Sequence, residues 1–329
     1  MFRKGILGLS LACLTLFPAA CSSKKAPPDS IAAREEGSSS RTPAAFCADS
    51  AYSYVKRQVD FGPRVPNTPA HRATSEWLAS ELERHGAKVT LQKATLRAFD
   101  GTELQAVNIL GSYNPEAKDR ILLLAHWDSR PWADNDPDEA NRRKPVPGAN
   151  DGASGVGVLL EIARQLGKEA PSTGVDILFL DAEDWGTEND ESSWALGARH
   201  YASNLPVEVA PPSRGVLLDM VGGTGAVFRR EYFSQYYVPD LVNELWQTAA
   251  DLGYGDTFSN QTGGAITDDH VEFIRAGIPV IDIIEFNPSG GFNPRWHTVA
   301  DDMDGIDAVT LGKAGTVVLT WLRSQKSSE

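Results

Sequence analysis

The stretch "GVDILFLDAED", residues 174–184, is an apolar run followed directly by two adjacent acids. The apolar part has the length of a strand that is covered on both faces of a sheet. Glu183 and Asp184 stand side by side at its carboxyl end. Neighbouring carboxylates repel each other, and burial adds a desolvation cost. A bound cation, or a proton that is moved during a reaction, would offset that cost. The stretch therefore predicts a buried strand with a site at its end.

Further apolar runs and helical patterns indicate the rest of the fold. Three more runs have strand length: "RILLLAHWD" (120–128), "RGVLLDMVGG" (214–223) and "IPVIDIIEF" (278–286). Helical spacing of apolar residues occupies 69–86, 156–166, 239–253 and 307–324. Strands that alternate with helices predict an α/β fold. We expect a three-layer sandwich with a central mixed, largely parallel sheet flanked by helices.

Polar residues collect where the predicted strands end, which is where ligands bind in such sheets. The candidates are His126, Asp128, Asp151, Glu183, Asp184, Asp219, Asp268, Asp269, His270 and His297. A hydrolytic zinc site needs three protein ligands, an open position and a base outside the ligand set. No local pair has the HExxH spacing. Residue types alone therefore leave two alternatives open, a metal site or solvated loop acids. Three other histidines, His71, His85 and His200, are expected to lie outside the site.

The N-terminus has the pattern of a secretory signal. Arg3 and Lys4 precede an apolar run over residues 5–17, which is too short for a membrane-spanning helix. The small residues before Cys21 resemble a bacterial lipobox, which implies cleavage before Cys21 and a lipid on this residue. Ser22 after it implies sorting to the outer membrane, facing the periplasm. A plain signal peptide with a chance cysteine is the alternative.

The composition then divides the chain into three parts. Residues 22–44 are rich in Ser, Ala, Pro and charge, which is typical of a flexible tether. We expect a signal peptide over 1–20, a tether with lipidated Cys21 over 21–44, and a catalytic domain over 45–325. Cys47 would be the remaining thiol, so no internal disulfide is expected.

The charge of the mature chain limits its partners. Loss of two basic residues with the signal takes the formal charge from −13 to −15. This charge argues against a nucleic-acid partner, because phosphates would be repelled. It suits substrates that carry a free amine. The chain is expected to act as a monomer.

Five segments resemble the zinc aminopeptidase fold family. They are "AHWDS" (125–129), "PGANDGASGV" (147–156), "FLDAED" (179–184), "LLDMVG" (217–222) and "TDDHVEFIRAGIPV…RWHT" (267–298). Within that family they are most similar to glutaminyl cyclases (glutaminyl-peptide cyclotransferases), particularly the bacterial ones. The similarity covers most of residues 46–323. The segments "GANDGASG" and "DDHVEF…WHT" are the most specific.

The resemblance implies roles for individual residues. One zinc ion would be held by Asp151, Asp184 and His297. Glu183 would be the general base and acid, and Asp268 would form a carboxylate hydrogen-bond network with Asp219. Two aromatic residues would contact the substrate: Trp296, beside a ligand, and Trp194, in a loop by the crevice. The substrates would be peptides or proteins with N-terminal glutamine, converted to pyroglutamate with release of ammonia.

Proton transfer near neutral pH requires a raised carboxyl pKa at Glu183. A dry pocket and the neighbouring Asp184 would raise this pKa, while zinc would lower it, so the sequence leaves the net sign open.

The number of metal ions is the main alternative. In two-zinc aminopeptidases, the residues matching His126 and Asp219 bind a second metal, and the one matching Asp151 bridges. Cyclases keep these residues with one zinc, so we expect His126 to be a structural residue. A third alternative is a non-catalytic lipoprotein of this fold. It predicts loss of zinc ligands or of the base, and none of these residues is lost. Two departures stand out. Asp184 replaces the Glu common in aminopeptidases, and Asp282 replaces a His of animal cyclases.

Overall fold

The computed structural model describes residues 41–207, 210–286 and 291–325, and its centre is a six-stranded sheet. The strands follow the order β1-β2-β4-β3-β5-β8 across the sheet. Their bounds are β1 Lys88–Arg97, β2 Glu103–Tyr113, β3 Arg120–His126, β4 Gly174–Leu180, β5 Arg214–Asp219 and β8 Val280–Ile284. The four strands predicted from apolar runs, β3, β4, β5 and β8, are confirmed, and they are neighbours in the sheet.

The sheet is mixed and largely parallel, as predicted. The pairs β4–β3, β3–β5 and β5–β8 are parallel, whereas β1–β2 and β2–β4 are antiparallel. The sequence analysis did not identify β1 and β2. The residues of β1 alternate between exposed and half-buried, so this edge strand has no continuous apolar run.

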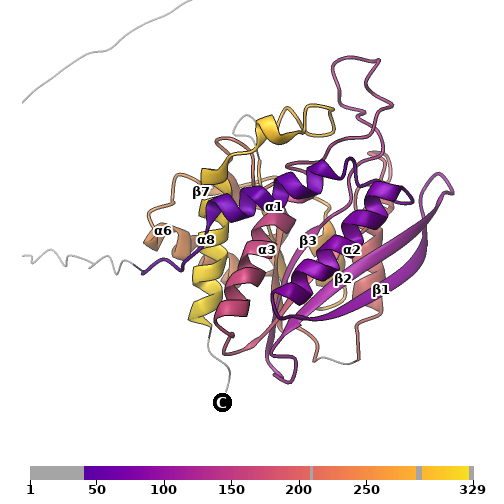
Figure 1. The fold of residues 1–329 in the computed structure, drawn as a ribbon. Coiled ribbons are helices and arrows are strands. Elements are labelled where there is room, and N and C mark those ends of the chain that lie inside the picture. The colour runs from indigo at the N-terminus through magenta and orange to yellow at the C-terminus, as the bar shows by residue number, and fades with distance from the viewer. Residues whose placement is uncertain (1–40, 208–209, 287–290, 326–329) are drawn as a thin grey trace, which may run out of the picture. The chain divides into compact units, whose positions relative to one another are not determined.

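Helices cover both faces of the sheet and complete the three layers (Figure 1). One face carries α1 (Ala48–Asp60), α2 (Pro69–Arg84), α3 (Ala153–Lys168), α6 (Pro239–Asp251) and α8 (Ala308–Ser324). The opposite face carries α4 (Leu196–Ser203) and α7 (Asp269–Arg275). The other elements are α5 (Tyr232–Tyr237), the 3-10 helices η1 (Glu191–Ser193) and η2 (Met303–Gly305), and a small sheet of β6 (Phe228–Arg230) and β7 (Phe258–Thr262).

The apolar residues of strand β3 contribute alternately to the hydrophobic cores on the two faces of the sheet. Ile121, Leu123 and Ala125 belong to the core beneath α3, while Leu122 and Leu124 belong to the core on the other face. Successive side chains of a strand point to opposite faces, so a strand covered on both sides must be apolar throughout. Full burial of such a side chain stabilises the fold by about 1.5–3 kcal/mol.

Local signals set the helix ends. Thr68 caps α2 by accepting a hydrogen bond from the backbone N–H of His71 at 3.2 Å, and Pro69 occupies the first turn. Gly86, with a φ of +85°, follows the last turn. The helix predicted over 69–86 is therefore confirmed as α2. The three other predicted helices correspond to α3, α6 and α8.

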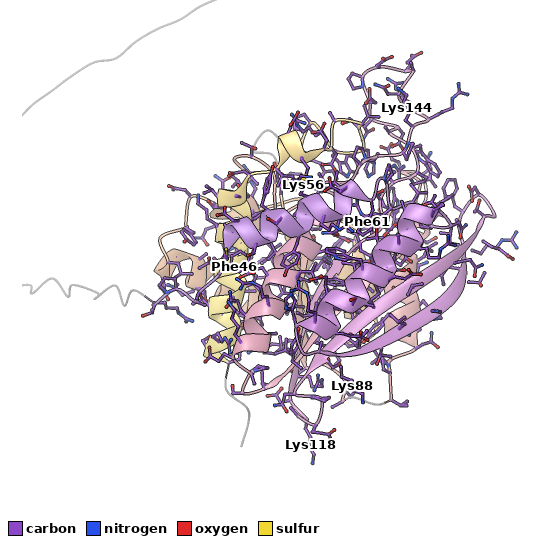
Figure 2. All side chains as sticks on the ribbon, in the orientation of Figure 1. Phe46, Lys56, Phe61, Lys88, Lys118 and Lys144 are labelled. Atoms are coloured by element: carbon purple, nitrogen blue, oxygen red, sulfur yellow. The ribbon has the colours of Figure 1, made fainter. Side chains whose placement is uncertain are left out.

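The first described residues pack against helix α8. Phe46, labelled in Figure 2, packs against Gly315 of α8, where a larger side chain would collide with its ring. The predicted signal, most of the tether and Cys21 lie outside the described residues. Among the residues that are described, no helix is long and apolar enough to cross a membrane.

Candidate active site

The predicted site residues converge at the carboxyl ends of the parallel strands. His126 and Asp219 are the last residues of β3 and β5, and Glu183 and Asp184 follow β4. Three further residues reach the same place: Asp151 before α3, Asp268 at the N-cap of α7 and His297 in the loop after β8. All seven side chains are buried. The crevice that the sheet topology predicts is therefore where the chemically active residues lie.

Asp151, Asp184 and His297 form a group that fits a metal ion. His297 Nε2 lies 3.2 Å from Asp184 Oδ1 and 3.6 Å from Asp151 Oδ2. The candidate ligand atoms all lie within 4.8 Å of one another. Asp184 Oδ2 is buried and has no hydrogen-bond partner in the described part of the chain, which is costly unless a cation satisfies it. Two carboxylates and one imidazole match the ligand set of a catalytic zinc site.

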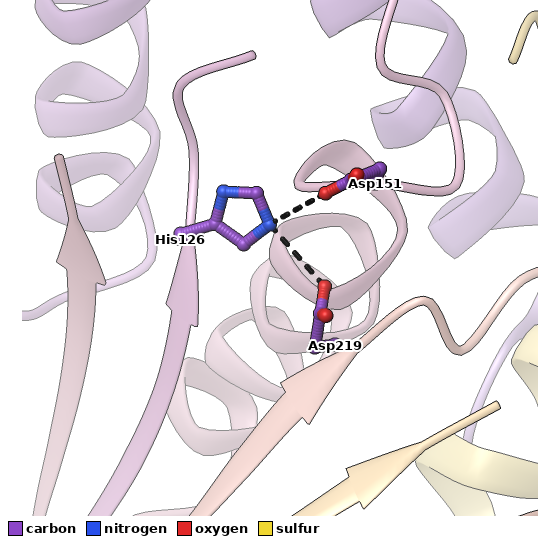
Figure 3. A group of neighbouring side chains, drawn as sticks. All are labelled: His126, Asp151 and Asp219. Carbon is purple, nitrogen blue, oxygen red and sulfur yellow. Dashed lines mark hydrogen bonds and ion pairs between the residues drawn. The ribbon is translucent and has the colours of Figure 1, made fainter. Parts of the chain in front are cut away.

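A second group shares Asp151 with the first. His126 Nε2 lies 3.0 Å from Asp151 Oδ1 and 3.2 Å from Asp219 Oδ1 (Figure 3). These three residues also place one candidate ligand atom each within 4.8 Å of the others. His126 Nδ1 faces Asp128 Oδ1 at 3.5 Å. The geometry therefore allows a second metal ion, or a protonated His126 that bonds the carboxylates directly.

The turn after β4 is shaped by two buried carboxylates. Ala182 has a φ of +54°, a conformation that costs roughly 1–2 kcal/mol for a residue with a side chain. Its N–H donates to Asp181 Oδ1 at 2.8 Å. Asp128 accepts the N–H groups of Glu183 and Asp184 at 3.1 and 3.2 Å. Asp128 thus orients its neighbours and holds both acids at the crevice.

His71 lies outside the cavity, as expected, but it supports the same turn. Its Nε2 lies 2.9 Å from both carboxylate oxygens of Asp181. Its ring stacks on that of Trp127, with centroids 4.4 Å apart. His71 and Asp181 are 110 residues apart in the chain, so no local pattern links them. The pairing is visible only in the folded protein.

The loop that carries Asp151 is held by two residues that the sequence analysis did not single out. Arg64 is fully buried and donates to the carbonyl oxygens of Pro147 and Gly148, both at 2.6 Å. The carboxylate of Asp301 accepts the N–H groups of Asp151, at 3.1 Å, and of the preceding residue, at 2.8 Å. These bonds fix the backbone that leads to the shared carboxylate.

A cavity of about 340 Å³ opens beside the metal group. Glu183 lies at it together with Asp219 and Asp268, and Trp194 and Trp296 form part of its wall. Its volume is at the small end of the range typical of ligand pockets.

Both tryptophans of this wall pack on the ring of His297. The Trp194 and Trp296 centroids lie 5.9 Å and 3.7 Å from the imidazole centroid, with near-parallel planes. Ile266, Phe286 and Phe292 add apolar surface to the cavity. The two residues proposed to contact substrate therefore also pack against a predicted zinc ligand.

Glu183 has the electrostatic surroundings of a proton-transfer group. Burial raises its pKa well above the usual value, and the charges of Asp184, Asp268 and Asp269 add to this effect. His126 opposes it. In the metal-free protein the sign that the sequence left open is therefore upward. A divalent cation at Asp184 would lower the pKa again.

Asp268 and Asp219 are close in the cavity but share no hydrogen bond. Asp219 contacts His126, while Asp268 Oδ2 has no hydrogen-bond partner among the described residues. Burial raises the pKa of both carboxyls. The pKa of Asp219 is raised to about 7 by burial and the negative charge of Asp268, against the opposing effect of His126. Two carboxyl groups can bond each other only when one is protonated. The predicted network therefore requires a proton between these residues.

Further buried acids lie behind Asp268. Within the ranges that the structure describes, both carboxylate oxygens of Asp269 and of Asp282 lack hydrogen-bond partners. His270 Nε2 lies 3.2 Å from Glu231 Oε2, and its Nδ1 is 4.0 Å from Asp282 Oδ2. Burial raises the pKa of Asp282 well above its usual value, and the negative charges of Asp268, Asp219, Glu231 and Asp269 raise it further.

The long insert after β3 has two parts. Its base contacts the site, since the N–H of Asn135 donates to the carbonyl oxygen of His297 at 3.1 Å. Its tip is exposed, and Lys144 marks it in Figure 2. The insert therefore combines a base beside the site with a tip in solvent.

Comparison with known proteins agrees with this geometry. Residues 108–322 match peptidase family M28, a span that includes every predicted zinc ligand. The chain belongs to this family. An M28-type fold explains why the ligands follow the strands of the parallel sheet.

Two solved structures and one curated relative illustrate the likeness. A glutaminyl cyclase from Bacteroides thetaiotaomicron is 52% identical, with a TM-score of 0.85, and covers 87% of this chain and 100% of its own. A leucine aminopeptidase precursor from the same species is also 52% identical, with a TM-score of 0.84 and the same coverage. The glutaminyl-peptide cyclotransferase of Bos taurus is 24% identical over 292 residues, covering 78% of this chain and 76% of its own length.

Proposed function

We propose that this M28-family chain is a glutaminyl-peptide cyclotransferase, which converts N-terminal glutamine of peptides or proteins to pyroglutamate and releases ammonia. The observation that carries the proposal is Glu183, a buried carboxyl group with a raised pKa, in a small cavity beside the metal group. The likeness of the whole fold to a bacterial glutaminyl cyclase supports it.

Asp151, Asp184 and His297 would hold one zinc ion. A bound zinc ion supplies Lewis acidity, which makes the side-chain carbonyl of glutamine more electrophilic. Trp194 and Trp296 would pack on the aliphatic part of that side chain and exclude water from the reacting atoms.

Glu183 would carry the proton of the reaction. The α-nitrogen of glutamine forms a bond to the side-chain carbonyl carbon, and Glu183 accepts a proton from that nitrogen. Glu183 then gives the proton to the side-chain nitrogen, the bond from this nitrogen to the carbonyl carbon breaks, and ammonia leaves. A carboxyl group serves both steps when its pKa lies near the working pH. Asp268 and Asp219 would support the protonated state through their charge and a shared proton.

His126 would replace a second metal ion. Burial alone would lower its pKa, but Asp128, Asp151 and Asp219 raise it well above the usual value. A protonated imidazole at this position supplies positive charge between Asp151 and Asp219. With His126 in this role, the site would hold one zinc ion per chain.

The test is to incubate the purified protein with a peptide that begins with glutamine and to follow the peptide by mass spectrometry. A product lighter by one ammonia molecule, with the rest of the peptide intact, is the expected result. Release of free glutamine would contradict the proposal and favour the second candidate function.

That second candidate is a two-metal aminopeptidase. The observation in its favour is the second ligand group, His126, Asp151 and Asp219, which is assembled around the shared carboxylate. It predicts two metal ions per chain and removal of varied N-terminal residues.

The location of the protein is a separate part of the proposal. We infer from the pattern around Cys21 that the chain is lipid-anchored in the bacterial outer membrane and faces the periplasm. We also propose that it acts as a monomer. Cys21→Ser is expected to move the protein from the membrane fraction to the soluble fraction. A variant that stays with the membrane would contradict the lipid anchor.

A further inference from the structure

Arg130 is a buried guanidinium that contacts a predicted zinc ligand. It lies in the loop after β3, and its side chain is 1% exposed. Its Nη1 donates to Asp184 twice, to the backbone carbonyl oxygen at 3.2 Å and to Oδ1 at 3.3 Å. A buried charge is tolerated only when it is paired and hydrogen-bonded, so these contacts are part of the folded site.

The other side of the guanidinium reaches toward His297. Arg130 Nε and Nη2 donate to the two oxygens of Asp134, at 2.7 and 2.5 Å, in a bidentate pair. Asp134 Oδ1 lies 3.6 Å from His297 Nδ1, the ring nitrogen away from Asp184. The bidentate pair thus holds the Asp134 carboxylate on the side of His297 away from Asp184. A carboxylate opposite the outer nitrogen of a ligating histidine favours one orientation of the ring.

Arg130 also packs on the aromatic wall of the cavity. Its guanidinium carbon lies 4.8 Å from the centroid of the Trp194 ring and 5.2 Å from that of Trp132. Trp194 in turn stacks on His297. The guanidinium of Arg130 thus contacts Asp184 directly. It also contacts Asp134 and Trp194, both of which lie against His297.

We propose that Arg130, paired with Asp134, is a positioning residue of the metal site, which holds Asp184 and His297 in the orientation that binds zinc. This inference rests on the proposed ligand set. Because Asp134 neutralises the guanidinium, the pair adds little net charge beside the metal, and its effect on zinc is mainly geometric. Lysine keeps the charge but lacks the planar fork with which arginine bonds both Asp134 and Asp184.

The experiment measures zinc affinity by competition with a chelator in wild type, Arg130→Lys and Asp134→Asn. Loss of a partner that orients metal ligands typically weakens metal binding by about 10- to 100-fold, and we expect Arg130→Lys to fall in this range. Asp134→Asn should weaken binding in the same direction, and its partly exposed side chain makes it the safer variant for folding. Excess zinc should restore most of the turnover of Arg130→Lys.

Arg120→Lys is the matched control. Arg120 is equally buried and forms a bidentate pair with Asp176, but it lies at the start of β3, the end away from the site. Its variant should lower the melting temperature with and without zinc by the same amount and leave zinc affinity unchanged.

Each outcome separates the two proposals. Wild-type zinc affinity in both Arg130→Lys and Asp134→Asn, or an equal loss of stability with and without zinc as in Arg120→Lys, would overturn the positioning role. Absence of zinc binding by the wild-type protein would instead overturn the proposed function.

Discussion

Glu183 and Asp184 are adjacent in the chain but have different surroundings. Asp184 faces His297 Nε2 at 3.2 Å and receives a hydrogen bond from Arg130, as a carboxylate that binds a metal would. Glu183 faces the cavity, and burial together with neighbouring negative charges raises its pKa. Under the proposed function, Asp184 would bind the metal and Glu183 would carry the proton. This division follows from side-chain direction, since the backbone N–H groups of both residues are bonded to the same Asp128.

Glu183→Gln tests the proton-transfer role. The amide is nearly isosteric but cannot accept and return the proton, so turnover should fall by about 10²- to 10⁴-fold. Zinc content and melting temperature should stay close to those of wild type, because Glu183 is not a predicted ligand. Steady-state kinetics with a glutamine-initiated peptide and metal analysis check both points. Turnover near the wild-type rate would remove Glu183 from the proposed role.

His126→Ala tests the number of metal ions. If one zinc ion suffices, the variant should retain one zinc per chain and lose less than about tenfold in kcat/KM, equivalent to less than about 1.4 kcal/mol of transition-state stabilisation. Metal analysis of wild type and variant, purified in the same way, gives the answer. A fall from two metal ions to one would favour the aminopeptidase alternative.

At the scale of elements, the turn after β4 depends on partners from two distant segments. Asp181 receives N–H groups from Val107 of β2 and from Ala182, and the ring of His71 from α2 completes its bonds. The turn therefore joins a helix on one face to the sheet and to the acids of the site. A buried carboxylate that loses one such partner costs about 1–3 kcal/mol or more.

His71→Ala should destabilise the protein by about 1–3 kcal/mol and lower zinc affinity, because the turn that presents Asp184 loses support. His85→Ala is the control on the same helix. The His85 ring bonds Tyr54 at 2.8 Å, away from the turn, so this variant should lose stability without losing zinc affinity. Chemical denaturation and chelator competition measure the two effects. Equal zinc affinities in the two variants would show that the turn does not depend on His71.

At the scale of the whole molecule, buried acids make stability depend on pH. Burial and the charges of Asp268, Asp219, Glu231 and Asp269 raise the pKa of Asp282 well above the value of about 3.9 in an unfolded chain. Between these two pKa values the folded protein binds more protons than the unfolded one. The stabilisation that protonated Asp282 contributes is therefore fully present below about pH 4, and it is lost as the pH rises toward the pKa of Asp282 in the folded protein.

Asp282→Asn should remove the loss of stability that ionisation of Asp282 causes at higher pH. With chelator present throughout, the melting temperature of the variant should exceed that of wild type at pH 8, and the difference should shrink toward pH 4. Asp307→Asn should show the opposite pattern. Burial alone would raise the pKa of Asp307, but hydrogen bonds from Thr310 and Val309 lower it, so its stabilisation is present near neutral pH and lost in acid. Parallel pH profiles of wild type and Asp282→Asn would contradict the assignment.

The sequence predicted those parts of the fold that burial marks locally. Strands β3, β4, β5 and β8 are covered on both faces and read as apolar runs, and α2 carries its own cap signals at Thr68 and Pro69. The edge strand β1 is open to solvent and carries no such run. The signal and lipid anchor at Cys21 remain predictions, since they lie outside the described residues.

The sequence by itself determined which residue types stand at the carboxyl ends of the parallel strands, because a strand buried on both sides is mostly apolar along its length and becomes polar where it reaches the crevice. Tertiary structure alone decided which of them meet. His71 with Asp181, Arg64 with the loop before Asp151, and Arg130 with Asp184 are pairs from distant segments. Such pairs produce no periodic pattern in the sequence. Their interaction energy arises only when the folded sheet brings the two side chains together and removes water from both.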